Sequence, residues 1–291
     1  MKAGAIVRIV LFAILTVCLI AALVIGLTAH GFLSRIQSSG GNPVDYRQSG
    51  GQVDAADVTE LQIQWVSGSI TLIPGDTDQI HFEEAGIIPD GNEMVWKLSG
   101  STLILQYRAN DWAGWFRSFG FTGSSVSKEL TVTVPRDWIC QELRVDAVSA
   151  DLSVTGLELG DVTVSNVSGD NDFLDCDCRE FTLNTTSGDV RFSGSLEELD
   201  VESVSASCTA VLTAAPRQIS MDCVSGRLEL TLPEDCGFTA DLDSVSGRVS
   251  SDFGTTSSGG THIYGDGACR IEVDSVSGDI LIHKGSAGKA A

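Results

Sequence analysis

The chain has 291 residues, with 39 acidic and 18 basic side chains and a formal net charge of −21 at pH 7. This excess of carboxylates repels phosphate backbones and anionic lipid surfaces, which argues against nucleic acid as a partner. The four histidines, His30, His81, His262 and His283, lie far apart in sequence without metal-ligand spacing, and we expect no metal site and no cofactor.

An uncharged apolar run extends from about Ile9 to Thr28 and is long enough to cross a bilayer as a helix. Lys2 and Arg8 precede it, so the positive-inside rule places residues 1–8 in the cytoplasm and the rest of the chain outside. A cleaved signal peptide is the alternative, but its apolar core would be shorter and no Ala-x-Ala-like site follows. We therefore expect a retained transmembrane helix over 9–28 and a single-pass protein of the cell membrane.

Two segments have the composition of flexible chain. Residues 29–57 are rich in Gly, Ser, Gln and Asp, which predicts a tether between the membrane and the folded domain. Residues 285–291 are small and polar, which predicts a disordered tail.

Residues 58–139 contain strand-like runs without a fixed period, which predicts an irregular β region that begins and caps the repeats. Inside it lies an unusual concentration of aromatic residues. A flap over the apolar end of the stack, an exposed patch for a partner and insertion into the membrane interface are the three interpretations of this segment. Its aromatic residues are Trp112, Trp115, Phe116, Phe119 and Phe121.

A Val-Ser-Gly turn recurs through the chain, and from Ser149 to Ser246 the repeat serines are about 20 residues apart, a spacing typical of solenoids. Apolar residues stand six and four positions before each serine and usually three and five after it, the alternation of two strands joined by a corner. Antiparallel hairpins would alternate in the same way, but they would not need one turn chemistry at one period. We predict an all-β fold, a single-stacked β-solenoid with regular repeats over 140–284, preceded by the one transmembrane helix. The repeat serines are Ser67, Ser149, Ser168, Ser187, Ser205, Ser225, Ser246 and Ser277.

The spacing of the cysteines is consistent with stacked coils. Cys236 and Cys269 fall in almost the same column of neighbouring coils, where a spacing of about 4.8 Å lies within disulfide range, and this pair is the predicted disulfide. Cys208 and Cys223 occupy ladder positions and are interpreted as small apolar residues that fill the interior.

Aspartates recur two residues after several of the repeat serines, as at Asp151, Asp170 and Asp189. We interpret this column as a solvated surface with local charge neutralisation, and a divalent cation between acidic rungs is the alternative. The Gly-x-Ser-x-Gly, Walker and His-Glu-x-x-His motifs are absent from the sequence, and we do not expect an enzyme.

These features resemble the bacterial family of proposed adhesins that is also called the Toastrack domain. The resemblance rests on the anchor, the tether, the run from Thr131 to Pro135 and the Val-Ser-Gly-Asp-like turns after Val145, and it covers roughly residues 55–284. It implies a repetitive β-strand domain, often tethered to the membrane and associated with cell-envelope proteins and envelope-stress signalling. It implies no catalytic residues. The usual Asp is replaced by Ser69, Ser207, Arg227 and Arg248, so a uniform array of Asp ligands is not expected.

Three classes of function follow. The leading expectation is a noncatalytic, extracytoplasmic scaffold or interaction module whose partner is an envelope or membrane protein. The second is an adhesin that binds wall glycan or a host surface. The third is a polysaccharide-active β-helix enzyme, which would group outward acids with Lys or Arg in a groove, and the scarcity of basic residues argues against it.

Overall fold

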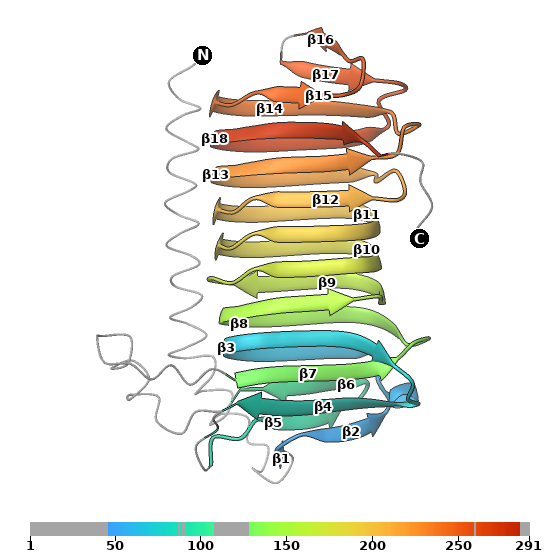
Figure 1. Cartoon of the computed structure of the whole chain (residues 1–291), viewed down its shortest axis with the longest axis vertical. Coiled ribbons are helices and arrows are strands. Elements are labelled where there is room, and N and C mark those ends of the chain that lie inside the picture. The colour runs from blue at the N-terminus through green and yellow to red at the C-terminus, as the bar shows by residue number, and fades with distance from the viewer. Residues whose placement is uncertain (1–45, 87, 89–90, 108–127, 259, 286–291) are drawn as a thin grey trace, which may run out of the picture.

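The structure is a computed structural model that describes residues 46–86, 88, 91–107, 128–258 and 260–285. Eighteen strands pair into one sheet, which winds around an apolar interior as a stack of coils with a front and a back layer (Figure 1). The one helical element in these ranges is the 3-10 turn η3 (Ala55–Asp57). The all-β prediction is confirmed.

The long strands bend at the Val-Ser-Gly corner and continue into the second layer. Shorter strands complete the coils or form antiparallel pairs at the two ends. The strands are β1 (Arg47–Gln48), β2 (Gly51–Asp54), β3 (Glu60–Gly75), β4 (Gln79–Gly86), β5 (Val95–Ser99), β6 (Thr102–Gln106), β7 (Lys128–Pro135), β8 (Ile139–Thr155), β9 (Glu158–Asn166), β10 (Asn171–Ser187), β11 (Val190–Ser205), β12 (Cys208–Leu212), β13 (Gln218–Leu232), β14 (Phe238–Ser246), β15 (Val249–Ser251), β16 (Thr256–Ser258), β17 (Thr261–Tyr264) and β18 (Cys269–Lys284).

The repeat serines lie in one column. Ser149 lies opposite Ser67 and bridges to Ser168, and the Ser187 amide donates to the Val167 carbonyl. Ser205 lies opposite both Ser187 and Ser225, and Ser277 lies opposite both Ser225 and Ser246. These pairings are parallel, which excludes a sandwich of antiparallel hairpins.

The interior consists of apolar ladders, as the alternation predicts. One ladder passes from Ile63 through Val145, Val164 and Leu183 to Val201, each residue opposite the next. All five side chains are fully buried. Each rung therefore packs on rungs above and below, and burial is continuous along the stack.

The N-terminal end of the stack does not follow chain order. β3 lies between β8 on one side and β6 and β7 on the other, so the chain forms the second coil with β3 before it forms the end coil with β4 to β7. β2 pairs with β4, and β1 pairs with β5. The predicted tether over residues 29–57 extends too far, because residues 47–57 contain β1, β2 and η3. The Gly-rich composition of this segment predicted flexible chain, but part of it forms β2, which is stabilised by pairing with β4.

The C-terminal end is also out of order. β18 pairs with β13 on one side and with β14 and β15 on the other, so the last strand of the chain lies between two strands that are consecutive in sequence. β17 pairs antiparallel with both β14 and β16 beyond it. The end of the stack is therefore closed by residues that precede β18.

Within the described ranges, no helix has the length and apolarity to cross a membrane. The predicted transmembrane segment 9–28, the cytoplasmic residues 1–8 and most of the predicted tether lie outside these ranges. Most of the predicted tail, 285–291, lies outside them as well.

Candidate interaction surfaces

Seven carboxylates occupy the outer face of four adjacent coils, formed by β11, β13, β18 and β14. In one row Glu202, Asp222, Asp274 and Asp243 lie opposite one another in turn. Neighbouring strands are about 4.8 Å apart, so these side chains repel one another. We call this set the acidic face, and its members are Asp200, Glu202, Asp222, Asp241, Asp243, Glu272 and Asp274.

The pKa values on the acidic face show its energetic cost. Burial, reinforced by neighbouring carboxylates, raises the pKa of Asp200, Glu202, Asp222 and Asp274. The ion pair that reaches the face in the described part of the chain joins Arg270 Nε to Glu272 Oε1 at 2.8 Å. The sequence analysis identified the row of acidic residues that contains Asp222, but it did not identify the second row, which contains Asp200 and Glu272.

Acidification from pH 7 to pH 5 is expected to raise the melting temperature by about 3 °C. Each of these carboxyls has a higher pKa in the folded chain than in the unfolded chain, where the pKa is near 4. Protonation of these carboxyls therefore stabilises the folded state fully below the unfolded pKa values, and this stabilisation is lost as the pH rises through the folded pKa values. Burial is the largest cause of the raised pKa of Asp222, and repulsion from Asp200 and Glu272 adds to it. Thermal unfolding followed by circular dichroism at both pH values measures the effect.

Two variants serve as controls for this pH effect. Asp222→Asn should raise the melting temperature at pH 7 and reduce the difference between the two pH values. Asp137→Asn, in the exposed turn between β7 and β8, should change neither. A lower melting temperature at pH 5 would contradict the account of the acidic face.

The corner aspartates have a structural role that the sequence analysis missed. Asp151 Oδ1 accepts a hydrogen bond from the Asp170 amide at 3.0 Å, and Asp170 Oδ1 accepts one from the Asp189 amide at 2.9 Å. Asp189 and Asp279 do the same for the amides of Ser207 and Arg248. Each carboxylate thus binds the backbone of the next coil. In the described ranges, no group of three or more His, Cys, Asp or Glu side chains is arranged to hold a metal ion.

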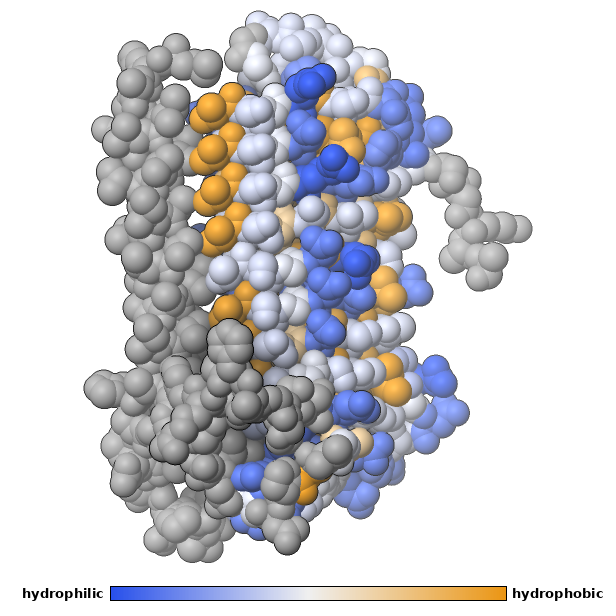
Figure 2. All heavy atoms as spheres, turned by 60° about the vertical axis from the view of Figure 1, so that its left-hand side comes forward, coloured by the Kyte–Doolittle hydropathy of each residue, from blue (hydrophilic) through white to orange (hydrophobic). Residues whose placement is uncertain are grey.

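An apolar column follows the corner beside the serines, and Figure 2 shows such a column along this edge of the stack. The repeat valines, directly before the serines, are mostly half-buried, and Val245 near the C-terminal end is 45% exposed. Thr186 interrupts the series. The corner therefore presents an apolar strip next to a polar one.

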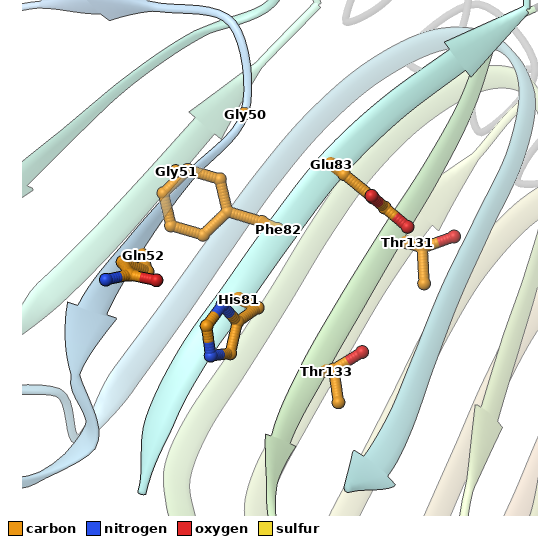
Figure 3. Close-up of a pocket in the computed structure, with 8 residues that line it drawn as sticks. All are labelled: Gly50, Gly51, Gln52, His81, Phe82, Glu83, Thr131 and Thr133. Carbon is orange, nitrogen blue, oxygen red and sulfur yellow. The ribbon is translucent and has the colours of Figure 1, made fainter. Parts of the chain in front are cut away.

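A groove of about 480 Å³ crosses β2, β4 and β7 at the N-terminal end. Gln52, His81 and Thr133 lie opposite one another across the three strands, and Glu83 and Thr131 form the adjacent row. The groove lies beside the backbone of Gly50 and Gly51, and the polar side chains stand around it (Figure 3). Its imidazole, carboxamide, carboxylate and hydroxyl groups are suited to hydrogen bonding with a polar ligand.

A buried ion pair lies at the same end of the stack. Lys128 Nζ lies 2.8 Å from Glu84 Oε1 and 4.0 Å from the centroid of the Tyr107 ring, and it also donates to the Asn92 carbonyl. Burial lowers the pKa of Lys128, while Glu84 opposes that shift. Tyr107 and Lys128 flank residues 108–127, so the chain leaves and re-enters the described fold at one point. The predicted aromatic patch lies outside the described residues.

Replacement of Glu84 by Gln is expected to lower the free energy of unfolding by about 3 kcal/mol, because it removes the carboxylate that pairs with the buried Lys128 ammonium. Urea denaturation of the variant and the parent chain measures the loss. Glu83→Gln is the matched control, since Glu83 is adjacent but exposed, and it should cost less than about 0.5 kcal/mol. Equal losses of unfolding free energy in the two variants would show that the ion pair between Lys128 and Glu84 does not stabilise the fold.

The structure brings the predicted cysteine pair together. Cys236 and Cys269 are free thiols in mutual side-chain hydrogen-bond contact. Cys208 and Cys223 are buried free thiols, as their ladder positions suggested.

The Toastrack DUF4097 family matches residues 58–208 and 193–283. Three solved structures are similar over most of the chain. A proposed cell adhesion protein from Clostridium sporogenes is 13% identical, with a TM-score of 0.33, over 82% of this chain and 100% of its own. A proposed adhesin from Bacteroides fragilis is 11% identical, with a TM-score of 0.42, over 81% and 97%.

The third solved structure is a proposed lipid-binding protein from Parabacteroides distasonis, 12% identical, with a TM-score of 0.34, over 84% of this chain and 98% of its own. No curated protein matches the chain. The family match spans the solenoid from β3 to β18. The chain therefore belongs to the Toastrack family.

Proposed function

We propose that the chain is a noncatalytic interaction module of the bacterial cell envelope, held outside the membrane by the apolar segment 9–28. The acidic face is the observation that carries this proposal. Burial raises the pKa of Asp222 and Asp274, and repulsion from neighbouring carboxylates adds to the shift. A partner protein with a cationic surface would relieve that repulsion on binding.

The chemistry of three buried cysteines in the interior ladders supports a noncatalytic role. Burial raises the pKa of Cys140, Cys178 and Cys208 to about 12. Thiols that stay protonated at neutral pH are poor nucleophiles. These cysteines serve as packing groups in the ladders, and the outer surface is what remains for binding.

Site-specific photo-cross-linking in cells tests the proposal. A photoreactive residue at Ser220, within the acidic face, should give one defined adduct with an envelope protein, and added salt should weaken it. The matched position is Thr163, in the same column three strands away along β10, β11 and β13. Equal, salt-insensitive adducts from both positions would overturn the acidic face as the binding surface, and recovery of the chain in the soluble fraction would overturn the anchor.

Adhesion to wall glycan is the second candidate, and the polar groove over β2, β4 and β7 favours it. Its hydrogen-bonding side chains suit a polyol ligand. If the groove binds glycan, His81→Ala should reduce co-sedimentation of the chain with purified cell-wall glycan, while Thr209→Ala on β12 should not.

A further inference from the structure

The thiols of Cys236 and Cys269 meet where β14 packs on β18. The Cys269 amide donates to the Gly237 carbonyl at 2.9 Å, and Cys269 lies opposite Phe238 in the parallel pairing. Cys236 is held by a turn in which its amide donates to the Pro233 carbonyl at 3.0 Å. The side chains of the two cysteines are hydrogen-bonded to each other. The pairing of β14 with β18 therefore places the two sulfur atoms next to each other.

The two thiols differ in reactivity. The hydrogen bond from Cys269 lowers the pKa of Cys236, whereas the same contact and burial raise the pKa of Cys269. Burial raises the pKa of the other five described cysteines, Cys140, Cys176, Cys178, Cys208 and Cys223. These shifts belong to the folded protein, in which Cys236 is the more readily deprotonated of the two thiols and Cys269 lies beside it.

The position of the pair in the fold makes such a bond useful. Cys236 lies two residues before β14, and Cys269 is the first residue of β18, the strand that lies between β13 and β14. A bond between them would link the end of the stack to the strand that supports it. It would also close the loop formed by residues 237–268, which restricts the unfolded chain.

We propose that Cys236 and Cys269 form a disulfide in the exported protein, made by exchange with the disulfide of an envelope thiol–disulfide oxidoreductase. The Cys236 thiolate attacks one sulfur of that disulfide and releases the other as a thiolate. Cys269 then loses its proton and attacks the Cys236 sulfur, which forms the Cys236–Cys269 bond and releases the second thiolate. Two thiols are oxidised, one disulfide is reduced, and the two protons pass to the released thiolates.

The exchange must precede complete docking of β18, because Cys236 is 2% and Cys269 is 1% exposed in the folded protein. It also rests on the extracytoplasmic location in the proposed function, since disulfides persist in oxidising compartments. In the folded protein the same burial protects the bond from reductants.

Counting the thiols of the full chain tests the disulfide. Cells are lysed in N-ethylmaleimide, and the chain is purified from membranes and denatured. Mass spectrometry should show six of the eight cysteines alkylated, and a peptide that links Cys236 to Cys269. After reduction all eight should react. Eight alkylated cysteines without reduction, in chains that external protease digests in intact cells, would overturn the disulfide.

A separate assay distinguishes failure of the disulfide from failure of the location. Purified reduced chain is denatured and refolded in glutathione buffer at a defined ratio, which tests the bond wherever the protein resides. Formation of the Cys236–Cys269 link supports the geometry, and a link between other cysteines contradicts it. Resistance of the chain to external protease would instead contradict the location on which the cellular experiment rests.

Stability gives a second readout. Reduction of the disulfide-linked chain should lower its melting temperature by about 10 °C. Cys269→Ser should melt near the reduced parent and show no further loss with reductant. Cys208→Ser, which removes a buried thiol from a ladder, should keep the full reductant-dependent shift. The same shift in Cys269→Ser would show that another bond is responsible.

Discussion

Leu230→Asp is expected to abolish cooperative folding of the C-terminal half of the solenoid. Leu230 is fully buried and lies between Ala210 on β12 and Ile282 on β18. The substitution places an unpaired carboxyl in an apolar ladder and removes packing on both sides, at a cost of about 5 kcal/mol or more. Urea denaturation followed by circular dichroism measures the loss.

Arg227→Ser is the control for that substitution, because it changes the same strand on its outer side. Arg227 is exposed on the outer side of β13. We expect a loss below about 1 kcal/mol. If Arg227→Ser were as costly as Leu230→Asp, the inner and outer faces of β13 would be wrongly assigned.

Gly188→Ala is expected to destabilise the chain by about 4 kcal/mol. Gly188 has φ +115, a conformation that L side chains rarely adopt, and a Cβ atom there would lie 2.1 Å from the Gly169 carbonyl oxygen of the adjacent coil. Backbone must move in both coils to accept it. The change in urea midpoint, compared with the parent chain, measures the cost.

Gly254→Ala is the matched control, because a Cβ atom at Gly254 meets nothing within 4 Å. The loss there should stay below about 0.5 kcal/mol. Comparable midpoints for the two variants would mean that the corner is looser than its geometry indicates, and that adjacent corners are not in contact.

The coil itself could be predicted from the sequence because its signals are local. The spacing of Leu143 and Val145 before Ser149, and of Leu152 and Val154 after it, determines which side chains point inward. Asn171 is an exception at an inward position. It is fully buried, and its Nδ2 donates to the Gly169 carbonyl at 3.1 Å, so a polar rung is accommodated by the corner beside it.

The order of the coils could not be predicted, because every coil has the same pattern. Ser225 matches Ser246 and Ser277 equally well in sequence, and only the folded chain shows that it pairs with Ser277. The choice depends on non-local contacts at the two ends of the stack. The Lys128–Glu84 pair has the same origin, since its two residues lie on different strands and neither belongs to a motif.

The surfaces were partly predictable. The row containing Glu202 and Asp222 is visible in the sequence as acids three residues before the repeat serines. The hydrogen bonds from coil to coil at Asp170 and Asp189 were not expected, because repulsion between like charges suggested only a solvated column. The groove at Gly50 and Gly51 lies partly in residues assigned to the tether, so no local signal identified it.

The insertion of β18 between β13 and β14 sets the order in which the protein can be completed during synthesis. A nascent chain that emerges N-terminus first produces β13 and β14 before β18 exists. The facing edges of those two strands must remain unpaired, with exposed backbone N–H and C=O groups, until the last coil emerges. Coils from β8 to β13 can stack as they appear, but the C-terminal half can close only once β18 has emerged. A chain that ends prematurely would keep an open edge, the feature that proteases and chaperones recognise in incomplete products.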